Sequence, residues 1–219
     1  GIPVKEITGT VYEGGARGDL DVNLKVEVEG EFDTAGVLNA TKIEIKSATA
    51  IRVVAALDAV DGNLLSILGI TINTDNVKTR FEDKTDVGAS PLLPALTPGN
   101  YLEVRGQELP AGEITALIVE RDDKEARVEL RGFVEVDGLD KINRTLRVLN
   151  VTISTSAATE YRNESDLPMS EGAFWDAVTA GRLVNVREDR RDDPDPQYQD
   201  FPLPGITTID ATELQLELE

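Results

Sequence analysis

A hairpin pattern that recurs along the chain limits the fold more than any other feature of the sequence. The stretch KVEVEGEFDTAGVLNATKIEIK, residues 25–46, alternates apolar and charged side chains, passes through a glycine turn and alternates again. The stretch LEVRGQELPAGEITALIVE, residues 102–120, repeats this pattern, and in both copies an alanine follows ten positions after the glycine that ends the first strand. Alternation with a period of two is typical of half-buried strands. The sequence therefore predicts an all-β chain built from repeats.

A third copy of the hairpin is interrupted. LVNVRED at residues 183–189 supplies its first strand and IDATELQLEL at residues 209–218 its second. The segment 189–206 between them is acidic and rich in proline, which predicts an inserted loop that leaves the barrel and can be deleted without loss of the fold.

Upstream of each hairpin stands the same short motif, Thr-x-aromatic, beginning at Thr10, Thr79 and Thr159. Together with the hairpins it divides the chain into three tandem modules. Their predicted limits are 1–47, 51–122 and 126–219.

The third module shows the order of its elements most clearly. A short helix is expected within residues 170–181, capped by Ser170. Five strands with a helix between the third and the fourth is the order of an OB-type barrel. The predicted fold is three small OB-like β-barrels, the first one incomplete. The strands expected in the third module cover residues 127–136, 145–149, 151–158, 182–187 and 208–218.

The first module lacks the strands that occupy 52–66 in the second module and 127–147 in the third, because Gly1 aligns with Gly69. A barrel without these strands exposes backbone groups and an apolar groove. Two explanations stay open: the natural chain begins earlier and was cut, or a neighbouring subunit supplies a strand beside residues 2–10. The second explanation predicts partner-binding side chains in this module, at Ile2, Val4, Ile7 and Val11.

Composition excludes several classes of function. Forty-one acidic against 22 basic residues give a net charge of −19, which repels nucleic-acid phosphates. The chain contains neither Cys nor His, so it has no thiolate nucleophile and lacks the commonest general base. We therefore expect no catalytic residues and no enzymatic activity. No apolar run of 18 residues is present, and none of the sequence is expected to span a membrane.

The acidic insertion is the best candidate for a ligand site. Its carboxylates predict a divalent-cation site, with calcium as the ion, and its aromatic residues, together with one from the helix, predict a surface for a sugar or a protein partner. The competing interpretation is a solvated loop held by local Arg–Asp pairs. The carboxylates are Asp189, Asp192, Asp193, Asp195 and Asp200, and the aromatic residues are Tyr198, Phe201 and Trp175.

The whole pattern, Thr-x-aromatic, then Val-Glu-Val-x-Gly, then Ala-Thr-x-Ile-Glu-Ile, resembles the bacterial repeat family catalogued as domain of unknown function 5666. The resemblance covers nearly all of the chain and weakens in the third module, where Glu188 replaces the strand-ending glycine. It implies β-barrel modules on exported or lipid-anchored bacterial proteins, without established activity.

Two functional hypotheses follow. The first is a non-enzymatic extracytoplasmic structural protein that assembles with copies of itself into a polymer or filament by strand complementation. The alternative is a cell-envelope module that binds carbohydrate or a divalent cation.

Overall fold

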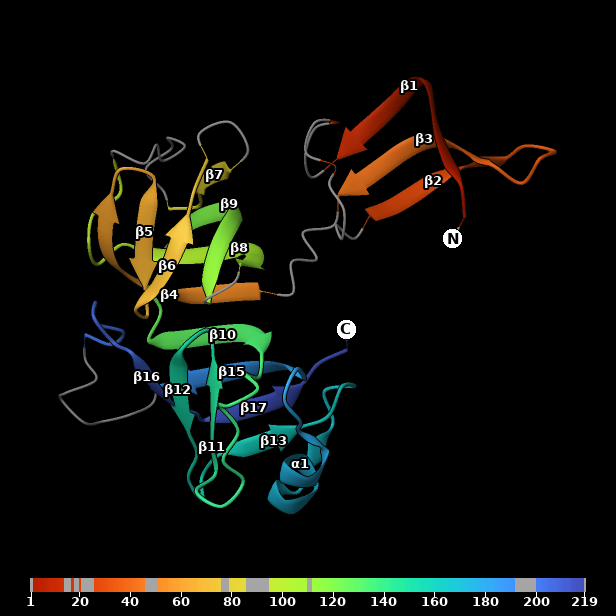
Figure 1. Cartoon of the computed structure of the whole chain (residues 1–219). Helices are drawn as coiled ribbons and strands as arrows, with labels where there is room; N and C mark the ends of the chain where they lie inside the picture. The colour runs from red at the N-terminus through yellow and green to blue at the C-terminus, as the bar shows by residue number, and fades with distance from the viewer. Residues whose placement is uncertain are drawn as a thin grey trace. The chain divides into compact units, whose positions relative to one another are not determined.

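The chain is β-rich throughout its described part. The computed structural model describes residues 2–13, 17, 20, 26–45, 51–75, 79–85, 95–109, 112–191 and 200–218 (Figure 1). It divides into two compact units, Gly1–Thr49 and Ala50–Glu219, here called unit 1 and unit 2. Strands dominate both units, and one short helix lies in unit 2, which confirms the predicted all-β class.

Unit 1 is a three-stranded sheet. Its order is β1-β3-β2, with β1 parallel and β2 antiparallel to the central strand β3. The strands are β1 (Val4–Glu13), β2 (Val26–Phe32) and β3 (Leu38–Ile45).

The first half of unit 2 is a closed five-stranded barrel. Around it, β4 pairs with β5, β5 with β6, β6 with β9, β9 with β8, and β8 again with β4. This cyclic order, with its parallel contact between β6 and β9, is that of an OB fold and confirms the prediction. The strands are β4 (Ile51–Asp61), β5 (Leu64–Ile67), β6 (Ile70–Asn73), β8 (Tyr101–Leu109) and β9 (Glu113–Asp122), and β7 (Arg80–Asp83) adds to the edge of β9.

The second half of unit 2 repeats this order. β10 pairs with β15, β15 with β17, and β12 runs parallel to β16. β11 pairs with β12, and a single bridge from Val134 to Val148 joins it to the end of β10. The strands are β10 (Arg127–Phe133), β11 (Thr145–Val148), β12 (Val151–Ser154), β13 (Glu160–Arg162), β14 (Pro168–Met169), β15 (Leu183–Asp189), β16 (Thr208–Asp210) and β17 (Glu213–Leu216).

The last predicted strand, residues 208–218, is divided in two. At the division, the Ala211 N–H donates to the Ser154 carbonyl (2.9 Å), while the Thr212 N–H donates to the Arg187 carbonyl (2.8 Å). The chain therefore turns from one neighbouring strand to another between β16 and β17. Alternation alone does not reveal such a change of partner, because both halves keep their apolar side chains inward.

The predicted helix forms as α1 (Glu171–Ala177). The Ser170 side chain accepts a hydrogen bond from the Ala173 N–H (3.2 Å), so Ser170 caps the helix as expected. Phe174 and Trp175 point into the core.

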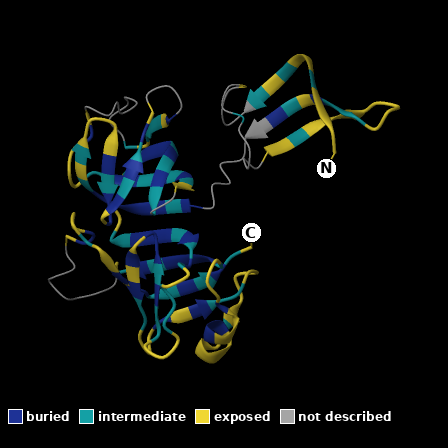
Figure 2. Ribbon diagram, viewed as in Figure 1, coloured by how far each residue is buried: buried dark blue, intermediate teal, exposed yellow. Residues whose placement is uncertain are grey.

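The two barrels of unit 2 share a sheet and a core. β4 and β10 pair antiparallel, with Val53 opposite Leu130. On the outer side of this junction, the Arg52 guanidinium pairs with Glu103 of one barrel (2.8 Å) and with Glu129 of the other. One continuous cluster of buried apolar side chains runs through both barrels. Figure 2 shows these strands as largely buried.

The end of the predicted inserted loop is part of this core, which corrects the expectation of a free excursion over residues 189–206. Phe201 and Pro202 are buried, and Phe201 belongs to the apolar cluster. The Gly205 N–H donates to the Asp58 side chain of the other barrel (2.6 Å). Deleting the whole segment would therefore remove core contacts. Residues 192–199 lie outside the described residues.

Candidate functional site

The Thr-x-aromatic motif has one structural role in all three repeats. Each threonine hydroxyl donates to the carbonyl of the alanine in the following hairpin, and each accepts a hydrogen bond from a backbone N–H three or four residues upstream. The donations run from Thr10 to Ala40 (2.7 Å), from Thr79 to Ala116 (2.8 Å) and from Thr159 to Ala211 (2.7 Å). The N–H groups are those of Ile7 (3.0 Å), Asp75 (2.8 Å) and Ser156 (2.9 Å). These contacts fix which residues of the repeats are equivalent.

The repeated glycine lets two strands approach closely. Gly30 lies opposite Ala40 and Gly106 opposite Ala116, each beside a register shift. A β-carbon at Gly30 would collide with the backbone carbonyl of Asn39, and one at Gly106 with that of Thr115. Glycine is therefore required for this pairing.

Glu188 occupies the corresponding place in the third repeat, and the pairing changes with it. Its carboxylate accepts a hydrogen bond from the Asp210 N–H (3.0 Å) and forms an ion pair with Arg190 (2.8 Å). Burial raises the pKa of Glu188, and the contact with Arg190 opposes this shift. In the third repeat the Glu188 side chain thus connects β15 to Asp210 of β16, where in the other two repeats the glycine backbone pairs directly with the neighbouring strand.

Unit 1 matches only part of a barrel. Val4 lies opposite Leu38 as Ile72 lies opposite Ile114. Further along β1, the motif residue Tyr12 lies opposite Ile43 in β3, as Phe81 of β7 lies opposite Val119 in β9. The strand β1 therefore combines the places of β6 and β7, while β2 and β3 take those of β8 and β9. Within its described residues, unit 1 has no counterpart of β4 or β5.

As a result, positions that line the core of the closed barrel are exposed in unit 1. Val4 is 47% exposed where its counterpart Ile72 is 0% exposed, and Val26 is 38% exposed where Leu102 is 0% exposed. Ile2, in the place of Ile70, is 64% exposed. We call this surface, lined by Ile2, Val4, Val26, Val28 and Leu38, the open face.

Two other predicted partner-binding residues lie elsewhere. Ile7 and Val11 are exposed, but their counterparts in the closed barrel are Asp75 and Arg80, which are exposed as well. Of the four residues proposed from the sequence, Ile2 and Val4 thus belong to the open face. The threonine hydroxyl contacts show that Ile7 is equivalent to Asp75 and Val11 to Arg80. A hydropathy pattern contains no trace of these contacts, so the sequence alone did not separate Ile7 and Val11 from Ile2 and Val4.

The predicted cation site is only partly described. Asp189 pairs with Arg191, whose hydrogen bond lowers the pKa of that carboxyl. Asp192, Asp193 and Asp195 lie outside the described residues, and within the described ones no three acidic side chains gather in a group that could hold a metal ion. Calcium binding stays a prediction.

The predicted aromatic surface is not formed by the two described residues assigned to it. Trp175 is 1% exposed and Phe201 is 7% exposed, and both lie in the apolar core. Trp175 packs edge-on against Phe174, with 5.7 Å between the ring centroids. Tyr198 lies outside the described residues. The rings of Trp175 and Phe201 stabilise unit 2 and offer no stacking surface.

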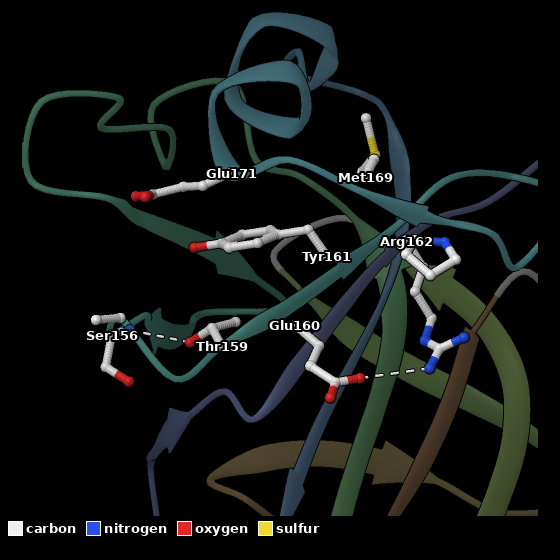
Figure 3. A pocket seen from close by; sticks show the side chains of 9 residues that line it. Ser156, Thr159, Glu160, Tyr161, Arg162, Met169 and Glu171 are labelled. Atoms are coloured by element: carbon white, nitrogen blue, oxygen red, sulfur yellow. Dashed lines mark hydrogen bonds and ion pairs between the residues drawn. The ribbon is translucent and has the colours of Figure 1, made fainter.

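A pocket of about 410 Å³ lies beside α1 (Figure 3). Of the residues drawn there, Thr159 uses its hydroxyl in the repeat contact, and Glu160 pairs with Arg162 (3.3 Å). Glu171 pairs with Arg144 (3.3 Å). These three polar side chains serve contacts within the fold, whereas the buried Tyr161 hydroxyl, which also lines the pocket, has no hydrogen-bond partner among the described residues. One unpaired hydroxyl does not define a ligand, so the open face of unit 1 is the stronger candidate for a functional site.

Comparison with known families agrees with the repeat pattern. The model of DUF5666, a domain of unknown function, matches residues 1–44, 53–120 and 131–194, which is most of the chain. The chain belongs to this family. Each DUF5666 segment contains one Thr-x-aromatic motif, and the third ends before β16 and β17. No curated protein and no solved structure matches the chain. In its described part, no helix is long and apolar enough to cross a membrane.

Proposed function

We propose that this DUF5666 protein is a non-enzymatic structural protein that acts outside the cytoplasm and assembles with neighbouring chains, in the first place copies of itself, by strand complementation. The observation that carries the proposal is the open face of unit 1. Its apolar residues are exposed at positions that strands β4 and β5 cover in the closed barrel.

The physical reason is the unpaired backbone at the two edges of this sheet. The outer edges of β1 and β2 have no strand partner within the described residues. Such edges are templates for pairing with another chain. Backbone hydrogen bonds would give the affinity, and burial of Val4 and Val26 would add the hydrophobic contribution. The extracytoplasmic location is proposed from the family resemblance.

Light scattering of the intact protein tests the assembly, with substitutions on and off the open face. We expect concentration-dependent oligomers for the unchanged chain and for Val11→Lys, because Val11 lies off the open face. Val4→Lys and Val26→Lys should shift the chain to monomer, since each puts a charge where a strand must pack. A chain that is monomeric at every micromolar concentration, with unit 1 resistant to protease, would contradict the proposal.

A further inference from the structure

We infer that the open face of unit 1 is built to receive a β-hairpin with the pattern of β4–β5, and that one strand cannot close it. This inference rests on the proposed function, in which unit 1 receives a strand from another chain. It adds which kind of segment the partner must supply. The evidence is the closed barrel of the same chain, which shows what fills the equivalent place.

Two different strands occupy that place. In the closed barrel, β4 pairs antiparallel with β8, and β5 pairs antiparallel with β6. The counterparts of β8 and β6 in unit 1 are β2 and the first part of β1. A single incoming strand would pair with one of these edges and leave the other unpaired, whereas a hairpin satisfies both.

The register of the hairpin follows from the repeats. Val53 lies opposite Val104 and Ala55 opposite Leu102, so the first incoming strand places apolar residues opposite Val28 and Val26. Leu65 lies opposite Ile72 and Ile67 opposite Ile70, so the second places apolar residues opposite Val4 and Ile2. The residues of β4 and β5 that do this, Val53, Ala55, Leu65 and Ile67, are at most 1% exposed.

Pro3 does not block the edge of β1. Its carbonyl accepts a hydrogen bond from the Leu38 N–H (2.9 Å), so Pro3 directs its backbone groups toward β3. Successive residues of a strand point their backbone groups to opposite edges. The missing N–H of proline therefore falls on the paired side, and Ile2 and Val4 present their groups at the free edge.

The hairpin that fits is one without a barrel of its own. β4–β5 and β10–β11 are already built into the barrels of unit 2. A second copy can donate one of them only by opening its own barrel, which is the cost of the self-assembly proposed above. A free hairpin with the same alternating apolar face should bind without that cost.

A fused chain tests this directly. A second copy of residues 51–68 is placed before Gly1, so that Leu68–Gly1 reproduces the turn of Leu68–Gly69, in which both residues have positive φ (56° and 73°). The control carries Val53→Lys and Leu65→Lys in the added copy alone. Amide hydrogen exchange is measured at Val4 and Val28, and light scattering is recorded for the fused, control and unchanged chains.

We expect exchange at Val4 and Val28 to slow at least about tenfold in the fused chain, and neither to change in the control, because burial and strand pairing protect amides. The oligomers expected for the unchanged chain should be absent from the fused chain, because the added hairpin already covers the open face. Equal exchange in the fused and control chains overturns the hairpin inference, even if the unchanged chain assembles. Protection by the hairpin in a chain that stays monomeric supports the inference and overturns the self-assembly proposed above.

Discussion

At the scale of single residues, the repeat is held by a hydroxyl that both donates and accepts. Thr159 is 8% exposed, and its hydroxyl joins the Ser156 N–H to the Ala211 carbonyl. Loss of the hydroxyl leaves these two backbone groups without that partner in a buried place, which is costlier than the loss of an exposed hydrogen bond.

Thr159→Val should therefore lower the free energy of unfolding of unit 2 by about 1–3 kcal/mol, although the side chain keeps its size. Thr152→Val on the exposed side of β12 is the control and should change stability by less than about 0.5 kcal/mol. Denaturant unfolding measures both. Equal effects of the two substitutions would contradict a special role for the motif.

Glu188 should make stability depend on pH. Burial raises the folded-state pKa of Glu188 above the unfolded value. The stability that the protonated carboxyl contributes is therefore fully present below the unfolded pKa and is lost as the pH rises through the folded pKa. Glu188→Gln should remove this decline, which follows from ionisation of a buried carboxyl. Thermal unfolding between mildly acidic and neutral pH tests it, and a decline of the same size in the variant would show that another group is responsible.

At the scale of elements, the segment before β16 connects the two barrels of unit 2. Phe201 packs in the shared core, and the Gly205 N–H reaches Asp58 on β4. The Lys124 ammonium also donates to the Asp200 carbonyl (2.5 Å). A segment that is polar and proline-rich in sequence thus fixes the geometry between elements far apart in the chain.

Phe201→Ala should destabilise unit 2 by about 3–5 kcal/mol, because it leaves a cavity in the core. Leu203→Ala is the matched control, since Leu203 is 51% exposed two residues away, and it should have little effect. The midpoint of urea unfolding measures the difference. Similar midpoints for the two variants would indicate that the segment is not part of the cooperative core.

At the scale of the whole molecule, the two units differ in how much core they have. Unit 1 contributes Ala40 and Ile43 to the buried apolar residues of the described chain, and neither belongs to the continuous cluster of unit 2. A small sheet with an exposed apolar face is marginally stable by itself.

Calorimetry should therefore show two transitions, with unit 1 unfolding at the lower temperature. Proteolysis below that temperature should first cut within residues 1–49 and leave unit 2 intact. One transition at all protein concentrations, or cleavage that begins in unit 2, would contradict this difference.

The sequence by itself determined the β class, the repeats and the capped helix. Period-two alternation, glycine and alanine at fixed spacing and the serine cap are local signals, and local signals can be read without knowing which strands meet. The repeats also identify two residues of the open face, because Ile2 and Val4 align with Ile70 and Ile72 of the second module.

Only the tertiary structure decided which side chains are inside and which strands pair. Trp175 and Phe201 looked available for a partner, yet both are buried, because their environment comes from strands distant in sequence. The division between β16 and β17 and the pairing of β4 with β10 likewise depend on long-range contacts. Ile7 and Val11 are as apolar as Ile2 and Val4, and only the register of β1 against β3 separates them from the open face.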